Sequence, residues 1–86
     1  MKMNNVKKYM LISVYDREIL SEIFHSERSA IAEMKAEMIQ EGNVPDSFFT
    51  EAHSKEEGNQ YGYSREGGYS NVSNFHNTCD WSIVEL

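Results

Sequence analysis

Residues 7–42 read KKYMLISVYDREILSEIFHSERSAIAEMKAEMIQEG, and this stretch decides the fold. Its beginning, residues 7–15, is apolar, aromatic or β-branched on both alternating faces, which predicts an inner strand covered on both sides. Residues 19–25 (ILSEIFH) fit a strand that pairs back in a hairpin, and they also fit a helical stripe. We favour the strand because Ser26 is a good N-cap for a new helix. The alternative is one long helix over residues 16–41.

A helix is predicted from about residue 27 to residue 41. Its apolar stripe lies at i, i+1, i+4 and i+8, namely Ala30, Ile31, Met34 and Met38, and the segment is rich in the good helix formers Ala, Met, Glu and Lys. Gly42 follows at the position where a left-handed residue often ends a helix. Pro45 then suits the start of a short second helix over about 46–57, which would be anchored by Phe48, Phe49 and Ala52.

The amino-acid composition changes between Gly58 and Cys79. Four of the five glycines lie there, together with three tyrosines and four asparagines, which predicts a long loop with one short strand at 61–64. Residues 79–86 (CDWSIVEL) predict a closing strand. The expected fold is therefore α+β, with a small antiparallel sheet in the order ββα-ββ and the main helix on one face; residues 1–86 form one domain.

Charge and cysteine content exclude several classes of function. The net charge is −6, and residues 26–57 carry three basic and eight acidic side chains, so direct nucleic-acid binding is not expected. The single cysteine, Cys79, allows no intrachain disulfide and fits a reducing compartment. No apolar run is long enough for a membrane span or a signal peptide. We expect a cytoplasmic protein without membrane contact, and its small core makes a homodimer a reasonable expectation.

We find no catalytic or metal-binding signature in the sequence. His76 and Cys79 have a spacing compatible with two zinc ligands, but His25 and His53 have no paired spacing that would complete a site of four. Residues three apart at the start of a strand tend not to face each other, which disfavours a nucleophile and base at the same two positions. We expect no enzyme, no metal and no cofactor.

Three carboxylates form a row along the predicted helix. Glu33, Glu37 and Glu41 lie at i, i+4 and i+8, and none of them has a lysine or arginine four residues further on. One interpretation is a solvated helical face. The other is an acidic patch that meets a basic surface of a partner protein, including a surface that normally holds nucleic acid.

The glycine-rich segment contains a second candidate binding cluster. It combines aromatic, amide and basic side chains, a mixture that is typical of binding hot spots and of stacking on bases: Tyr61, Tyr63, Arg65, Tyr69, Asn71, Asn74 and His76. The alternative is a loop whose tyrosines fold back and cap a small core. The sequence alone leaves both interpretations open.

The C-terminal stretch from Tyr69 to Leu86 carries a resemblance. Its Asn- and His-bearing segment, followed by Asp80-Trp81-Ser82-Ile83-Val84-Glu85, resembles the ending of small proteins of Firmicutes, their phages and integrated elements. The resemblance covers about the last fifth of the chain. It implies a mobile-element origin, and no functional residue is carried over from it.

These observations lead to two hypotheses about function. The first is a non-catalytic, acidic binding protein that contacts a host protein through the acidic helix and the tyrosine-rich segment, for example an anti-CRISPR-like, anti-defence inhibitor. The alternative is an oligomer that sequesters a nucleotide-type ligand in residues 61–76, where tyrosine rings would stack on the base and Arg65 would pair with its charge.

Overall fold

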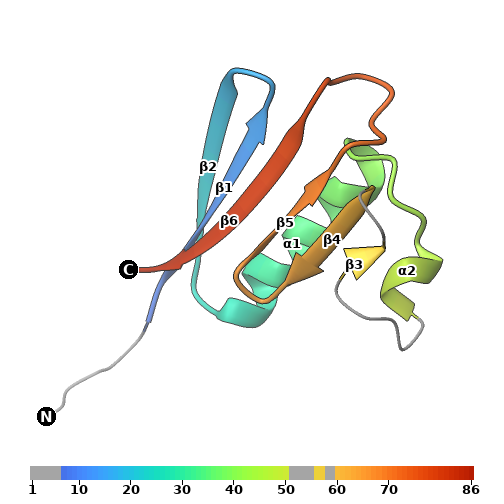
Figure 1. Ribbon diagram of the computed structural model, residues 1–86. Helices are drawn as coiled ribbons and strands as arrows, with labels where there is room; N and C mark the ends of the chain where they lie inside the picture. The colour runs from blue at the N-terminus through green and yellow to red at the C-terminus, as the bar shows by residue number, and fades with distance from the viewer. Residues whose placement is uncertain (1–6, 51–55, 58–59) are drawn as a thin grey trace, which may run out of the picture.

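The computed structural model describes residues 7–50, 56–57 and 60–86. The elements follow in the order β1 (Tyr9–Tyr15), β2 (Glu18–Phe24), α1 (Glu27–Gln40), α2 (Ser47–Thr50), β3 (Glu56–Glu57), β4 (Tyr61–Ser64), β5 (Gly67–Ser70) and β6 (Cys79–Glu85). The strands form one antiparallel sheet in the order β2-β1-β6-β5-β4-β3. The main helix α1 lies across one face of it (Figure 1). The predicted α+β class is confirmed.

The hairpin at the start of the sheet is confirmed as well. β1 and β2 pair along their whole length and are joined by the two-residue turn Asp16-Arg17. Asp16 has a φ of 59°, a left-handed conformation that Asp tolerates better than most residues. β1 is an inner strand, because β2 and β6 pair with its two edges. The strand interpretation of residues 19–25 is therefore correct, and the alternative long helix over 16–41 is wrong.

The two ends of α1 are set by a capping serine and by a left-handed residue that follows the helix. The Ser26 hydroxyl caps its first turn by accepting a hydrogen bond from the Ser29 amide at 3.1 Å. The helix ends at Gln40, and the left-handed residue beyond it is Asn43, with a φ of 57°, not the predicted Gly42. Gly42 is required for space: a Cβ there would lie 2.7 Å from the Met38 carbonyl oxygen and 3.1 Å from the Trp81 ring.

The core lies between α1 and the sheet. Of the predicted stripe, Ile31 is half-buried, and Ala30, Met34 and Met38 are fully buried. They pack on the strand side chains that point to the same side, and Val44 and Phe48 extend this layer over β4; the sheet contributes Leu11, Tyr15, Tyr61, Cys79 and Trp81. Both helices thus cover one face of the sheet.

The predicted two-sided burial of β1 is wrong within the part of the chain that the structure describes. Leu11, Ser13 and Tyr15 face α1 and are buried. The intervening Met10, Ile12 and Val14 point to the other face, which no helix among the described residues covers, and they are only half-buried. Both faces of the strand are apolar, but only one has a layer of helix over it.

Two further expectations require correction. The predicted long loop contains a second short strand, β5, which pairs with both β4 and β6; residues 71–78 then connect β5 to β6 without regular structure. The predicted helix over 46–57 is reduced to α2, and residues 56–57 form the strand β3. Residues 51–55 lie outside the described residues.

Candidate functional site

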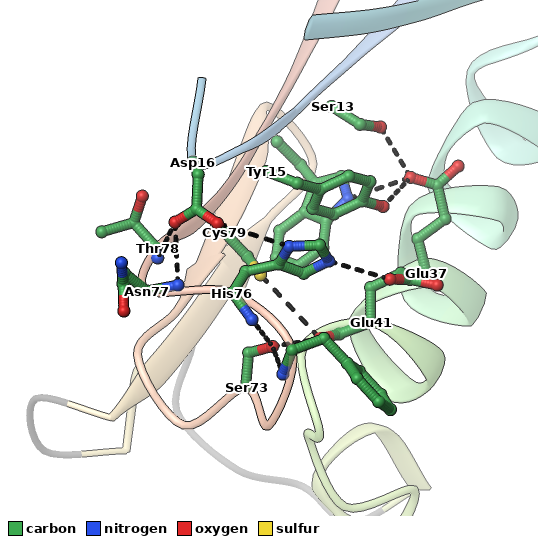
Figure 2. A network of polar contacts seen from close by, with 12 residues as sticks. Ser13, Tyr15, Asp16, Glu37, Glu41, Ser73, His76, Asn77, Thr78 and Cys79 are labelled. Carbon is green, nitrogen blue, oxygen red and sulfur yellow. Dashed lines mark hydrogen bonds and ion pairs between the residues drawn. The ribbon is translucent and has the colours of Figure 1, made fainter. Parts of the chain in front are cut away.

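One carboxylate joins the helix to the sheet. Oε1 of Glu37 accepts hydrogen bonds from the Ser13 hydroxyl at 2.6 Å, the Tyr15 hydroxyl at 2.7 Å and the Trp81 indole N–H at 3.0 Å (Figure 2). These donors come from the adjacent inner strands β1 and β6, and all three donor residues are buried. A single residue of α1 therefore satisfies three polar side chains of β1 and β6 on the covered face of the sheet.

The protonation states follow from this geometry. Burial acts to raise the pKa of Glu37, but the hydrogen bonds from Ser13 and Tyr15 stabilise the charged form and hold its pKa below the ordinary value. A hydrogen bond with Glu37, together with burial, raises the pKa of Glu33. Burial, and then the hydrogen bond to Glu37, raises the pKa of the Tyr15 hydroxyl. Glu37 is the charged member of the group, and Tyr15 serves as its neutral donor.

His76 forms the second part of the network. Its Nε2 lies 3.0 Å from Oε1 of Glu41 and its Nδ1 lies 3.5 Å from Oδ2 of Asp16, while its ring stacks on Tyr15 at 4.8 Å between centroids (Figure 2). Both ring nitrogens are engaged with carboxylates. His76 therefore connects the end of α1 to the β1–β2 turn.

Backbone contacts hold the segment 71–78 in place around this histidine. Oδ1 of Asp16 accepts hydrogen bonds from the amides of Asn77 and Thr78, and the Asp16 amide donates to the Thr78 carbonyl at 3.0 Å. The Ser73 hydroxyl donates to the Glu41 carbonyl oxygen at 2.7 Å. The network thus holds segment 71–78, which leads into β6, against both α1 and the β1–β2 turn.

Three further observations describe the thiol, the cleft and the titratable groups in and around the network. Burial raises the pKa of the Cys79 thiol, which disfavours the reactive thiolate, and its Sγ lies 3.9 Å from the Glu41 carbonyl oxygen. A cleft of about 120 Å³ reaches Ser13 and Glu37, whereas ligand pockets measure roughly 300–1,000 Å³. Among the described residues, no group of three or more His, Cys, Asp or Glu side chains is placed to hold a metal ion.

The predicted acidic row is divided by this arrangement. Glu37 and Glu41 are engaged with groups of the sheet and of segment 71–78, and Glu33 hydrogen-bonds to Glu37. Sequence reasoning missed that Glu37 lies three residues after Met34 and one before Met38, at the border of the buried stripe. That position was the available signal that its carboxylate points towards the sheet.

The predicted tyrosine-rich cluster is also divided. Tyr61 is buried, with its ring 4.9 Å from that of Phe48, and Tyr63 packs at 5.0 Å on Phe49 beneath the Lys35 ammonium group. The other members lie apart from these two rings. Arg65 forms an ion pair with Glu27 at 3.4 Å, and the backbone amide of Asn71 donates to the Gln60 carbonyl oxygen. His76 contacts Glu41 and Asp16, as described above.

Tyr69 lies on the opposite face of the sheet, where it borders a shallow groove. The groove has a volume of about 540 Å³, and its lining includes Gly62, Gly67, Gly68 and the carboxylates of Glu66 and Asp80. The glycines leave the surface of β4 and β5 low, and Tyr69, paired across from Asp80 in the register, forms one wall. Of the predicted cluster, Tyr69 and Tyr63 line this groove.

The uncovered face of the sheet carries a patch that the sequence prediction did not identify as a binding surface. It extends over three adjacent strands, and we call it the open face: Met10, Ile12, Val14, Ile19, Ile23 and Val84. Ile19, Ile23 and Val84 are 68%, 50% and 43% exposed. The register places Ile19 beside Val14, and Ile23 and Val84 on either side of Met10, so the patch is continuous.

Comparisons with protein-family models, with curated proteins and with solved structures find no match to this chain. The resemblance of residues 69–86 to proteins of mobile elements therefore stays a prediction. None of the helices in the described ranges has the length and apolar character needed to cross a membrane.

Proposed function

We propose that this chain is a non-catalytic binding protein that docks on a partner protein through the open face of its sheet. The observation that carries the proposal is the contrast between the two faces of β1. Leu11 is buried under α1, whereas Ile12 beside it points to a face where Ile19, Ile23 and Val84 are substantially exposed. Contiguous exposed apolar surface of this kind is typical of protein interaction sites.

The charges of the chain indicate the chemistry of the partner. The protein carries a net charge of −6. Asp80 is paired with Val14 of the apolar patch, and Glu66 lies in the turn between β4 and β5, on the rim of the neighbouring groove. A partner with an apolar centre and basic residues around it fits this surface, and the opposite charges would speed association. A host-directed, anti-defence activity is one form that such binding would take.

The acidic helix contributes less to this proposal than the sequence suggested. The carboxylates of Glu37 and Glu41 bond to other parts of the same chain, and a partner that used them would have to break those bonds. We therefore assign the contact to the sheet and not to α1.

A matched pair of charge substitutions tests the assignment. Val84→Asp places a carboxylate on the open face, and Ala32→Asp places the same group on the exposed outer side of α1. In affinity capture from cells that express the chain naturally, we expect a partner that wild type and Ala32→Asp retain and that Val84→Asp loses. Retention by Val84→Asp, with loss by Ala32→Asp, would contradict the proposal.

The groove beside Tyr69 supports a second candidate function, the binding of a small ligand. A ring could stack on Tyr69 above the glycines, but the rim carries Glu66 and Asp80, which favour a cation over the phosphates of a nucleotide. Thermal-shift measurements with nucleotides and with aromatic amines distinguish these ligands, because binding to the folded state raises the melting temperature. Tyr69→Ala should abolish any rise that is due to this groove.

A further inference from the structure

We propose that β2 is a self-association edge, through which two copies of the chain pair antiparallel about a two-fold axis at Ser21. β2 is the edge strand of the sheet, since β1 pairs with one side of it and no strand of the described chain pairs with the other. It runs for seven residues, Glu18–Phe24, without proline or lysine, and its charged side chains are Glu18 and Glu22. Proline and lysine are the residues that most often protect a native edge strand from pairing with another chain.

The register of the hairpin shows which backbone groups are free to pair. Because the turn has two residues, Tyr15 and Glu18 form the hydrogen-bonded pair next to it, and such pairs then alternate along the ladder. Ile19, Ser21 and Ile23 therefore direct their N–H and C=O groups away from β1. These three residues form a row of donors and acceptors along the outer edge of β2.

A two-fold axis at Ser21 uses the whole of this row. Ser21 then pairs with Ser21 of the second copy, and Ile19 pairs with Ile23 of the second copy on both sides of the axis. Shifting the register by two residues leaves part of the row unpaired. In one of these shifted registers, Glu22 would also stand directly opposite its own copy, which is destabilising.

The side chains on the open face support the same pairing. Ile19 and Ile23 are the most exposed large apolar residues of β2. The two-fold axis places Ile19 of each copy against Ile23 of the other copy. The open faces of the two copies would then form one continuous apolar surface. This inference does not depend on the proposed partner protein, because the edge of β2 and the face of the sheet are different surfaces.

The other side of the strand limits the strength of the pairing. Glu22 lies on the helix side of β2, near the carboxylates of Glu33 and Glu37, and the second copy would bring its own Glu22 close by. The contact is also short: seven residues at about 3.3 Å each extend over roughly 23 Å. Small interfaces of this type are weak and reversible, so we expect dimers in the micromolar range.

A proline and alanine pair at one position tests the inference. Proline is tolerated in an edge strand where its missing N–H faces outward, so Ser21→Pro should keep the monomer fold and remove the central donor of the row. Ser21→Ala also removes the hydroxyl but keeps the donor. In sedimentation velocity over 5–500 μM (roughly the range around such an affinity), wild type and Ser21→Ala should form dimers, and Ser21→Pro should dissociate about tenfold more easily or more.

A wild-type chain that stays monomeric at the highest concentration overturns the inference, and so does a dimer that Ser21→Pro leaves intact. Glu22→Gln gives a second measurement that does not require the proline variant to fold. Removing the like charges should tighten the dimer about threefold or more at low salt. An unchanged or weaker dimer in Glu22→Gln would also overturn the proposed register.

Discussion

At the scale of single residues, Glu37 has the most consequential position in the chain. One oxygen atom accepts three hydrogen bonds from two strands, and all three donor residues are buried. A buried donor that loses its acceptor lowers the free energy of unfolding by more than the hydrogen bond itself contributes, because no water molecule is available to replace the acceptor. Glu37 therefore determines how firmly α1 is held on the sheet.

We expect Glu37→Ala to lower the free energy of unfolding by about 3 kcal/mol. Glu37→Gln should cost only about 1 kcal/mol, because the amide oxygen still accepts hydrogen bonds. Urea denaturation measures both values, and Glu33→Gln is the control, with an expected change of roughly 0.5 kcal/mol or less. Equal losses in Glu37→Ala and Glu33→Gln would show that the three bonds do not contribute to stability.

Tyr15 makes the stability of the folded protein depend on pH in the alkaline range. Because burial and the bond to Glu37 raise its pKa above the ordinary 10.0, the folded state keeps the proton that the unfolded state releases. Its contribution is fully present below pH 10 and is lost as the pH rises above that value. Melting temperatures between about pH 8 and pH 11 should fall less steeply in Tyr15→Phe than in wild type. Parallel curves for the two proteins would contradict this assignment.

At the scale of elements, β5 depends on the smallness of its glycines. A Cβ at Gly67 would collide with the carbonyl oxygen of Trp81 and lie 3.3 Å from the Cα of Ser82. These are backbone atoms of β6, so neither can move without disturbing the ladder. At Gly68 a Cβ would lie 3.1 Å from Sδ of Met38, which belongs to a flexible side chain, and 3.0 Å from the Gly62 carbonyl oxygen.

Gly67→Ala should therefore destabilise the fold by about 2 kcal/mol, and Gly68→Ala by less. Ser82→Ala, on the exposed side of β6, is the control and should change stability by roughly 0.5 kcal/mol or less. Thermal unfolding followed by circular dichroism measures all three. A stabilising effect of Gly67→Ala would show that β5 does not lie against β6 as described.

The local signals of the sequence account for some elements and not for others. Ser26 and the stripe through Met34 and Met38 predicted α1 to within one residue, because capping and helical periodicity act over short distances. β5 was not predicted, because Gly67 and Gly68 show no apolar alternation. Their presence in a strand is explained only by the approach of β6, which is distant in the sequence.

At the scale of the whole molecule, the strand order could not be predicted from local patterns. The C-terminal β6 lies between β1 and β5, and this placement brings Trp81 to Glu37 and completes the covered face. The sequence did show that both faces of β1 are apolar, but it suggested that both were covered. Both predicted binding clusters proved to make contacts within the chain. The carboxylates of the acidic row bond to other groups of the protein, and the rings of Tyr61 and Tyr63 pack in or against the core.

One face of the sheet is covered by the helices and holds the fold together, and we propose that the other face contacts other molecules. Photo-crosslinking in the native cell tests this most directly, with benzoylphenylalanine placed at Ser82, on the uncovered side of β6, or at Ala36, on the outer side of α1. We predict protein adducts from Ser82 and none from Ala36. Adducts from Ala36 with none from Ser82 would contradict the account.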